Sequence, residues 1–509
     1  LVDGEMKEVQ VGDVNVLLVR LSGKFYAYWP ECPHQGAPLA KGLLRERHIR
    51  CPWHHAVFDA ESGKLRQPPA LDVLQHFELR VDDDDVVVSI PDVMPEQRPP
   101  EMASFDPQAD GRRFVILGSG AAGLTAAETL RENGFRGAVT VLTRDKHFPY
   151  DRTELSKHYL SKPDATRPYI RSEAFYAAWG IDIEIDTEVT QVAADAHKVA
   201  CADGSELEYD KLLLATGSRP RTLGAAGEDL PGVATLRTLD DCDWIRGLSE
   251  DARKVVVVGA SFIAMEVAAA LTWRGVEVAV AAPESEPFEA VFGRRIGRMY
   301  RKVHEDKHVS FHLGRTVERF EGDDALQTVV LDNGDRIEAN AAVVGVGVTP
   351  VTDYLRDIAT DDDGAVPVDA HLRAADDVYA AGDIARFPDW RDGSGIRIEH
   401  WRLAQQLGRA AAANMAGADA SYAGVPFFWT DQHMVITQYV GYAGDYDDIV
   451  FDGSPEDQDF VAYYVSGGRV RAAAGCGRDL PMCLIAERLG GAEAPALDKL
   501  QEEIASLSR

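Results

Sequence analysis

Two stretches of the chain, about 140 residues apart, each run from a short apolar segment through a glycine turn into a helix of small residues. The first has an apolar run at 113–117 and a turn at 118–123 with the pattern Gly-x-Gly-x-x-Gly. The second repeats this order at 254–258 and 259–264. A glycine turn of this kind lets the backbone approach a pyrophosphate at the N-terminus of the following helix. The pair therefore predicts two α/β, Rossmann-like domains, each with a parallel sheet that binds a dinucleotide.

The residues in and after the two turns indicate which dinucleotides they bind. Asp145 lies about twenty residues beyond the last glycine of the first turn, where a carboxylate that binds the ribose is expected. In the second turn Ser261 and Ala264 replace glycines, so this motif is the weaker of the two. Glu284 lies just beyond the strand that follows, and no arginine stands there to bind a 2′-phosphate. The second site is therefore predicted to prefer NADH over NADPH.

Two short N-terminal segments each supply one thiolate and one imidazole. Cys32 and His34 form the first pair, and Cys51 and His54 form the second. Zinc also binds two cysteines and two histidines, but zinc fingers group cysteine with cysteine and histidine with histidine. The mixed pairs instead resemble the Rieske pattern C-x-H and C-x-x-H, in which two thiolates hold one iron and two imidazoles the other. The resemblance implies a 2Fe-2S cluster on these four ligands, with His55 as a neighbouring loop residue.

The residues around these ligands predict a cluster of low potential. Respiratory Rieske proteins add a cysteine to each loop and place a serine and a tyrosine hydroxyl against the cluster sulfurs. This chain has Ala37, Trp53, Ala56 and Phe58 at the corresponding positions. Hydrogen bonds to cluster sulfur raise the potential, so we expect a value toward the low end of the Rieske range, about −150 mV. The resemblance also implies that electrons leave through exposed edges of the two histidine ligands.

Composition and charge exclude several classes of protein. A net charge of −30 argues against nucleic acid and anionic membranes as partners. No uninterrupted apolar stretch reaches the roughly 18 residues that a membrane span needs. The cysteines outside the cluster pairs are not closely spaced, which favours a reducing compartment and predicts a cytoplasmic protein. A chain of 509 residues is too long for one core and predicts three or four domains.

Residues 112–509 carry further motifs, and their order resembles the flavoprotein reductases that bind two dinucleotides. The motifs are Pro149-Tyr150-Asp151-Arg152 with Leu155-Ser156-Lys157, Ala215-Thr216-Gly217-Ser218-Arg219-Pro220, Ala381-Gly382-Asp383, Glu399-His400-Trp401 and Phe428-Trp429-Thr430-Asp431-Gln432. The resemblance is strongest to the ferredoxin reductases of oxygenase systems and to the apoptosis-inducing-factor-like branch with an N-terminal Rieske domain. Disulfide reductases of this architecture carry a C-x4-C pair after the first glycine turn, and this chain has none there. We therefore expect flavin electrons to leave through the cluster.

The resemblance implies roles for individual residues. Asp383 is expected to accept hydrogen bonds from the ribityl chain of FAD, and Arg152 to lie along the isoalloxazine ring. Lys157 is expected near the same ring and paired with Glu266, with a surface ion pair as the alternative. Trp401 is expected between the flavin and the cluster, with a packing role as the alternative. Lys157, Glu266 and Trp401 are the predicted catalytic residues.

The other contacts with FAD and NADH come from the same motifs and from the two glycine turns. His400 is expected to contribute its backbone rather than a proton. The full set predicted to bind the two dinucleotides is Gly118, Gly120, Ala122, Gly123, Asp145, Arg152, Lys157, Ala215, Thr216, Gly217, Arg219, Gly259, Ser261, Phe262, Ile263, Glu266, Glu284, Gly347, Gly382, Asp383, His400, Trp401 and Trp429.

These observations predict a multidomain chain with an all-β N-terminal domain, two α/β domains and an α+β C-terminal domain. Proline-rich, polar residues after the first domain predict a semi-rigid linker that keeps the cluster near its electron donor. The predicted boundaries are 1–91 for the Rieske domain, 92–111 for the linker, 112–238 and 364–419 for the FAD-binding domain, 239–363 for the NAD-binding domain and 420–509 for the C-terminal interface domain.

The predicted function is electron transfer from NADH through FAD to the Rieske cluster. The electrons then pass to an external protein acceptor, such as the terminal component of an oxygenase. The chain is expected to act as a monomer or a homodimer. Two alternatives remain open: a redox-sensing NADH-binding protein like some apoptosis-inducing-factor relatives, and an NADH oxidase that produces peroxide.

Overall fold

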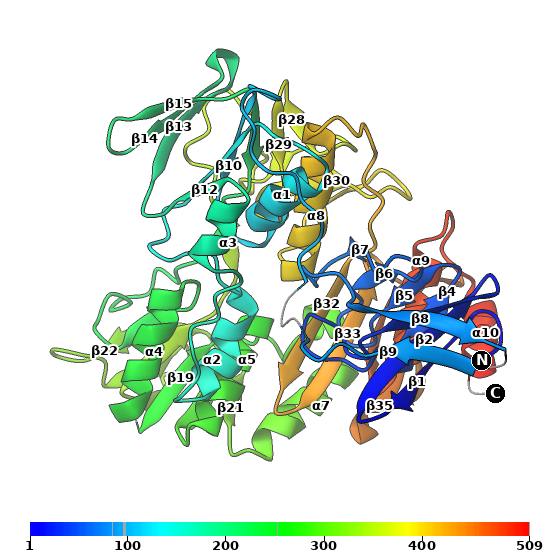
Figure 1. Cartoon of the computed structure of the whole chain (residues 1–509). Coiled ribbons are helices and arrows are strands. Elements are labelled where there is room, and N and C mark those ends of the chain that lie inside the picture. Colours follow the sequence, from blue (N-terminus) through cyan, green and yellow to red (C-terminus); the bar gives the residue numbers. More distant parts are fainter. Residues whose placement is uncertain (84, 95–97, 252, 508–509) are drawn as a thin grey trace.

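The computed structural model describes residues 1–83, 85–94, 98–251 and 253–507. Figure 1 shows the N-terminal strands (blue) beside the C-terminal strands (orange to red), with the cyan, green and yellow segments to the left of them and above. Two ion pairs join these opposite ends of the sequence, Arg45 to Glu503 and Arg50 to Glu487. The first and last domains are therefore neighbours in space.

The N-terminal domain consists of two antiparallel sheets, as its alternating apolar and turn residues predict. The larger has the strand order β1-β2-β3-β8-β9 and the smaller β4-β5-β6-β7. One cluster-ligand segment lies between β3 and β4, and the other connects β5 to β6. The strands are β1 (Glu5–Val11), β2 (Val14–Leu21), β3 (Lys24–Tyr28), β4 (Leu43–Arg45), β5 (His48–Arg50), β6 (Val57–Asp59), β7 (Leu65–Gln67), β8 (His76–Asp82) and β9 (Asp85–Ser89).

The first α/β domain has a six-stranded sheet in the order β12-β11-β10-β16-β29-β28, parallel except at β28. Gly408 allows helices α1 and α8 to pack closely, because any side chain at this position would collide with the backbone of Ala122. This close contact holds the start of α8 beside the glycine turn. The main elements are β10 (Arg113–Leu117), α1 (Ala121–Glu132), β11 (Ala138–Leu142), α2 (His158–Ser161), α3 (Glu173–Ala178), β12 (Ile181–Glu184), β16 (Lys211–Leu214), β28 (Arg373–Ala375), β29 (Val378–Ala380) and α8 (Trp401–Met415).

The second α/β domain has a five-stranded parallel sheet in the order β18-β25-β19-β20-β21. Its central strand is a valine run that is buried on both faces, as a parallel sheet covered by helices requires. The edge strand β18 precedes residue 239, so this sheet begins before the expected boundary. The main elements are β18 (Val233–Thr235), α4 (Leu239–Asp251), β19 (Lys254–Val258), α5 (Phe262–Trp273), β20 (Glu277–Ala282), α6 (Glu289–Phe292), α7 (Arg294–Glu305), β21 (Ser310–Leu313) and β25 (Ala341–Val344).

Smaller strands complete the two α/β domains. Three three-stranded sheets lie beside the main sheets: β13-β14-β15 and β22-β23-β24 are antiparallel, and β27-β30-β31 is mixed. A two-stranded sheet, β17-β26, links the two domains. These strands are β13 (Val189–Ala193), β14 (Lys198–Cys201), β15 (Glu206–Glu208), β17 (Ser218–Pro220), β22 (Val317–Glu321), β23 (Thr328–Leu331), β24 (Arg336–Glu338), β26 (Val348–Pro350), β27 (Val366–Pro367), β30 (Ala385–Pro388) and β31 (Gly395–Ile396).

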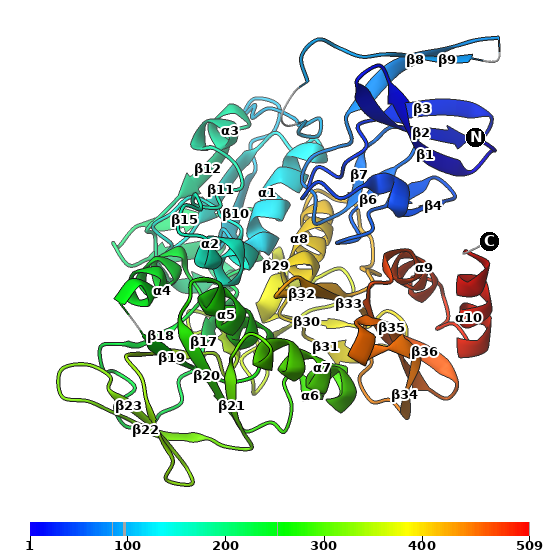
Figure 2. The ribbon, with the colours of Figure 1, turned by 90° about the horizontal axis from the view of Figure 1, so that it is seen from below.

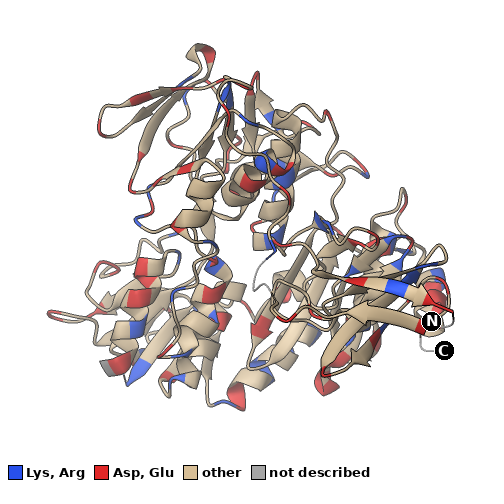
Figure 3. Cartoon of the chain, in the orientation of Figure 1, with Lys and Arg blue, Asp and Glu red and all other residues tan. Residues whose placement is uncertain are grey.

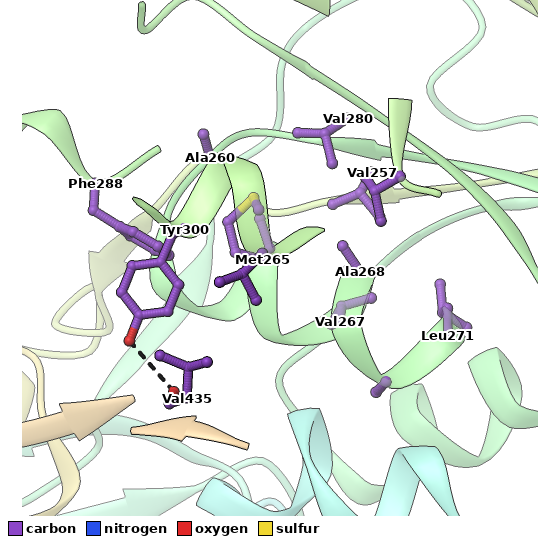
Figure 4. Packing of buried hydrophobic residues seen from close by; sticks show 14 of the residues in the cluster. Val257, Ala260, Met265, Val267, Ala268, Leu271, Val280, Phe288, Tyr300 and Val435 are labelled. Atoms are coloured by element: carbon purple, nitrogen blue, oxygen red, sulfur yellow. Dashed lines mark hydrogen bonds between the residues drawn. The ribbon is translucent and has the colours of Figure 1, made fainter. Parts of the chain in front are cut away.

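The C-terminal domain is a five-stranded antiparallel sheet in the order β32-β33-β36-β35-β34 with two helices, which confirms the predicted α+β class. Its core is continuous with that of the second α/β domain. At the boundary, the hydroxyl of Tyr300, on α7, donates to the carbonyl of Val435, on β33, at 3.4 Å (Figure 4). The elements are β32 (Phe427–Gln432), β33 (Val435–Gly441), β34 (Asp448–Ser454), β35 (Asp459–Ser466), β36 (Arg469–Cys476), α9 (Asp479–Leu489) and α10 (Leu497–Ser506).

The segment between the first two domains is fastened at both ends. The backbone amide of Arg98 donates to Asp72 of the N-terminal domain, and the amide of Ala103 donates to the carbonyl of Arg131 in α1. Residues 95–97 of the predicted linker lie outside the described residues. Figure 2 shows α8 between the first α/β sheet and strands β6 and β7, with α9 and α10 beyond them.

Charged residues of both signs occur throughout the ribbon (Figure 3), so the excess of acidic residues is spread over the domains. Among the described residues, no helix is both long and apolar enough to cross a membrane.

Candidate functional site

A cavity of about 680 Å³ lies between the two α/β domains and reaches the C-terminal domain. Its size falls in the range of cofactor sites. Most residues predicted to bind the dinucleotides line it. They are Gly118, Gly120, Ala122, Asp145, Arg152, Lys157, Ala215, Thr216, Gly217, Arg219, Phe262, Ile263, Glu266, Gly382, Asp383, His400, Trp401 and Trp429.

The first glycine turn needs glycine at two positions for steric reasons and leaves the third uncovered. A side chain at Gly118, where φ is +107°, would collide with the carbonyl of Ala215. A side chain at Gly123 would collide with the carbonyl of Gly118, so this glycine lets α1 pack on β10. Gly120 instead faces open space, with no atom within 4 Å of where a Cβ would stand. The turn therefore leaves an uncovered backbone surface at the helix N-terminus, which fits a pyrophosphate.

Of the second glycine turn, only Phe262 and Ile263 line this main cavity, but the turn is built like the first. Ser261 donates through its hydroxyl to the carbonyl of Gly345 at 2.8 Å, so its side chain is turned toward the neighbouring strand. Ala264 is accommodated because it faces Gly345, where any side chain would clash with it. Glu284 is exposed just beyond β20, and Gly347 (φ +99°) follows β25 near the same edge. The two substituted positions therefore still leave the turn open to solvent.

Asp145 is held by two neighbours from the motif that follows it. Tyr150 donates its hydroxyl to the Asp145 carboxylate at 2.6 Å, and Arg152 pairs with the same oxygen at 3.2 Å. The guanidinium of Arg152 also donates to the carbonyl of Arg237. Sequence reasoning placed Arg152 along the ring of the flavin; in the structure it also fixes the predicted ribose-binding acid.

Asp383 lies at the turn after β29 and is almost fully buried. The hydroxyl of Ser218 donates to its carboxylate at 2.6 Å, and Arg237 pairs with the same oxygen at 2.9 Å. Neither Ser218 nor Arg237 was among the predicted site residues. Ser218 lies within a quoted motif, whereas Arg237 stands outside every motif and carries no signal in the sequence.

Lys157 and Glu266 form the predicted ion pair, with Nζ and Oε2 2.8 Å apart. The side chain of Glu266 is 5% exposed and that of Lys157 19% exposed, which excludes the alternative of a surface ion pair. Glu266 also accepts hydrogen bonds from Ser156 at 2.6 Å and from Thr430 at 2.8 Å. Three donors, two from the first α/β domain and one from the C-terminal domain, thus fix one carboxylate of the second α/β domain at the wall of the cavity.

His400 stands at the N-terminus of α8 with its ring among aromatic side chains. The ring centroid lies 5.2 Å from that of Phe428 and 5.5 Å from that of Trp429. Burial lowers the pKa of His400 to about 3, so the imidazole is neutral near pH 7. The expectation that His400 transfers no proton stays a prediction.

The four predicted cluster ligands come together as two pairs, one of histidines and one of cysteines. The Nδ1 atoms of His34 and His54 are 3.0 Å apart, and the thiols of Cys32 and Cys51 contact each other. Burial lowers the pKa of His34 to about 4, which keeps its imidazole in the neutral form that binds metal. Among the described residues, no three of the potential metal-binding side chains surround a single point. Separate sulfur and nitrogen pairs fit a binuclear 2Fe-2S cluster and do not fit a tetrahedral zinc site.

Trp429, on β32, lies between the cavity and the histidine ligands. Its ring centroid is 4.1 Å from that of His54 and 6.3 Å from that of His34. Trp401 lines the cavity from the start of α8, but the ring that contacts the cluster ligands is that of Trp429. His54 is only 6% exposed and His34 is half-buried, so the edges of these two ligands are less exposed than expected. The tip of the N-terminal domain faces the interior of the same chain.

Buried hydrogen bonds hold the N-terminal domain in this position. Arg402, on α8 and 1% exposed, donates to the carbonyls of Pro68 and His55 at 2.9 Å each. Gln438, on β33, donates to the carbonyl of Pro52 at 3.0 Å and contacts the His55 ring at the same distance. The domain is therefore fastened to its neighbours from two sides, whereas a semi-rigid tether alone had been expected.

The comparisons with known families match three consecutive parts of the chain. Residues 1–78 match the Rieske [2Fe-2S] domain, residues 112–408 match the pyridine nucleotide-disulphide oxidoreductases, and residues 427–507 match the reductase C-terminal domain.

Individual relatives extend over most of the chain. Apoptosis-inducing factor 3 of Homo sapiens is 38% identical over 97% of this chain and 83% of its own length. The anthranilate 1,2-dioxygenase system ferredoxin–NAD(+) reductase component of Burkholderia cepacia is 34% identical over 72% of this chain and 92% of its own. The crystal structure of the covalent putidaredoxin reductase–putidaredoxin complex superimposes with a TM-score of 0.73 and 29% identity. That match covers 78% of this chain and 98% of the other.

Proposed function

The chain belongs to the pyridine nucleotide-disulphide oxidoreductase family, and we propose that it is an NADH-dependent reductase that passes electrons through FAD to its own Rieske cluster and on to an external acceptor. When bound, FAD would accept one hydride, and thus two electrons, from NADH and release the electrons singly, and the cluster would carry them one at a time. The position of Trp429 carries the proposal, because its ring contacts His54 on one side and lines the FAD-sized cavity on the other.

The two glycine turns are proposed to bind the two dinucleotides. The open backbone at Gly120 would hold the pyrophosphate of FAD at the N-terminus of α1. The turn that contains Ser261 would hold the pyrophosphate of NADH at the N-terminus of α5. The exposed carboxylate of Glu284, just beyond β20, would bind the ribose and disfavour a 2′-phosphate.

Three charged groups are proposed to position and tune the flavin. Lys157 would stabilise the negative charge of the reduced ring, and Glu266 holds its ammonium group in place. Asp383 has one carboxylate oxygen engaged by Ser218 and Arg237, and its other oxygen would accept from the ribityl chain. These groups act by binding and orientation, since the cofactors supply the redox chemistry.

The aromatic residues between the cavity and the cluster ligands are proposed to exclude water from the electron path. Trp429 fills the space between the cavity and His54, and the neutral ring of His400 packs against it. Trp401 is proposed to hold the ring of the flavin from the start of α8.

The external acceptor is proposed to be a protein that carries single electrons, such as the terminal component of an oxygenase. The name of the Burkholderia cepacia relative, a component of a dioxygenase system, supports this choice. The four cysteines outside the cluster pairs, Cys201, Cys242, Cys476 and Cys483, are buried and form no disulfide, which supports a reducing, cytoplasmic location.

The proposal is tested by NADH-driven reduction of cytochrome c with the holoenzyme. We expect Cys51→Ser to abolish reduction of cytochrome c while NADH still bleaches the flavin. Cys201→Ser, which changes a buried thiol far from the cluster segments, serves as the matched control and should retain activity. Full cytochrome c reduction by the Cys51→Ser protein would contradict the proposal.

A further inference from the structure

A second cleft, of about 810 Å³, opens from the cluster ligands to the protein surface. His54 and Trp429 line its inner end, and Trp53 continues outward from His54 with a ring-centroid separation of 6.4 Å. The cleft is bounded by α2 and α5 on one side and by the turn between β32 and β33 on the other. It is therefore a surface route to a cluster ligand that does not pass through the flavin cavity.

Large apolar side chains are exposed around this cleft. Trp53 is 38% exposed, Trp273 55%, Met434 80% and Ile436 42%, and all four line it. They come from the N-terminal domain, the second α/β domain and the C-terminal domain, so three domains build the rim together. Exposed apolar residues gathered on one face mark an interaction surface, whereas scattered ones need no explanation.

We propose that this cleft is the docking surface for the external electron acceptor. The inference deepens the proposed function and rests on it. The N-terminal domain is fastened by the buried hydrogen bonds of Arg402 and Gln438, and leaving its docked position would break all of them together. An acceptor that docks in the cleft reaches His54 and Trp53 without this cost. In the step, the cluster loses one electron and the acceptor gains it, and no covalent bond forms or breaks.

The charges of the cleft define the chemistry of the partner. Lys157 is already paired with Glu266, and Lys162 lies over the ring of Trp273 at 5.5 Å. The remaining charged residues that line the cleft are the carboxylates of Glu154, Asp431 and Asp479. With a net charge of −30 on the whole chain, the surface complements a basic partner. The occupant is thus an electron carrier whose redox group lies under an apolar patch ringed by lysine or arginine.

The first test changes the rim and uses cytochrome c, a basic one-electron carrier, as the probe. The double variant Met434→Lys and Ile436→Lys removes apolar contact and repels a basic partner. We expect the KM for cytochrome c to rise roughly tenfold or more, since like charges across an interface are costly. NADH-driven reduction of ferricyanide and of the cluster, followed by EPR, should not change. Val93→Lys, at a position that is 81% exposed and outside the cleft, is the matched control.

The second test asks whether the N-terminal domain must leave its docked position before the cluster can pass electrons to the acceptor. Arg45 and Glu503 pair across the contact between the first and last domains and are both partly exposed. Replacing both by cysteine allows a short bis-maleimide to cross-link the domains, because the native cysteines are buried. We expect the cross-linked chain to reduce cytochrome c as fast as the uncross-linked variant. Loss of this activity on cross-linking, with NADH-driven cluster reduction intact, would overturn the proposal.

Two other results would also overturn it. An unchanged KM in the lysine double variant, with a loss of self-association in sedimentation, would assign the surface to a second copy of the chain. Failure of NADH to reduce the cluster in the unaltered holoenzyme would remove the proposed function itself, and the role of this cleft with it.

Discussion

Replacing Arg402 by methionine is expected to lower the reduction potential of the cluster while changing the stability of the chain little. Among the described residues no carboxylate pairs with this guanidinium, although it is 1% exposed. Burial lowers the pKa of Arg402 from 12.5 to about 9, which corresponds to a penalty on the order of 5 kcal/mol for the buried cation. Removing the cation relieves this penalty.

The loss of hydrogen bonds acts in the opposite direction. Without Arg402 the carbonyls of Pro68 and His55 lose a donor, at about 1–3 kcal/mol for each buried acceptor. The two effects are of similar size, so the free energy of unfolding should change by no more than ~2 kcal/mol. This outcome is common when a buried ion is replaced by an apolar side chain of similar volume.

The potential should change because the two oxidation states of the cluster differ in charge. Two ferric ions, two sulfides, two thiolates and two neutral imidazoles carry no net charge, and one added electron makes the cluster negative. Arg402 donates to the carbonyl of His55, the residue after the ligand His54. At an assumed separation of roughly 6–12 Å, a cation would stabilise the added charge by about 1.5–3 kcal/mol at an effective dielectric constant near 20. For a one-electron couple this corresponds to about 60–130 mV. Arg402 therefore raises the potential above the low value expected from the missing hydroxyls.

The assay is an anaerobic redox titration of the holoenzyme followed by the EPR signal of the cluster. Arg402→Lys keeps the charge and should retain most of the potential, which separates charge from packing. Small-angle scattering of each variant checks that the N-terminal domain stays docked. A docked Arg402→Met protein whose potential lies within about 20 mV of the original would refute the reasoning, because the expected electrostatic shift is several times larger.

Three further perturbations follow from the site. Trp429→Leu should leave the reduction of flavin by NADH intact but slow the arrival of electrons at the cluster by tenfold or more, which stopped-flow absorbance would measure; an unchanged rate would exclude Trp429 from the path. Glu266→Gln removes the charge that holds Lys157 in place and should slow flavin reduction in single-turnover kinetics, on the order of 10–100-fold as for other positioning groups. Ser156→Ala, which removes only one hydrogen bond to Glu266, should have a smaller effect. Burial raises the pKa of Glu128 from 4.5 to about 7, so ionisation of this carboxyl lowers the stability of the folded chain as the pH rises from about 4.5 to 7. Glu128→Gln should therefore raise the melting temperature at pH 8 but not at pH 4.5. An equal rise at both pH values would contradict the assignment.

The cofactor motifs could be read from the sequence because each one is local. The first glycine turn and the pairs of cysteine and histidine each lie within a few residues, and their spacing alone limits the chemistry. The pairing of Lys157 with Glu266 was also predictable, because Lys157 stands in a quoted motif and Glu266 opens the helix that follows the second glycine turn. Their burial and the additional donors from Ser156 and Thr430 came only with the fold.

The relation of the domains could not be read from the sequence. Trp401 and Trp429 both lie in motifs near the flavin, and nothing local indicates which ring faces the cluster ligands. Arg402 is a charged residue on a helix, a pattern that predicts a solvent-facing position, yet the N-terminal domain covers it completely. Gln438 and Arg237 have no motif at all. These positions depend on contacts between segments far apart in the sequence. The docking of the first domain sets those of Arg402 and Gln438.

The order of electron arrival within one chain tests the central claim most directly. Anaerobic NADH is mixed with the oxidised holoenzyme, and flavin absorbance and the EPR signal of the cluster are followed over a single turnover. The account predicts that the flavin bleaches first and that the cluster signal then grows at a rate independent of protein concentration. A cluster that stays oxidised beside fully reduced flavin, or that is reduced only in proportion to protein concentration, would contradict it.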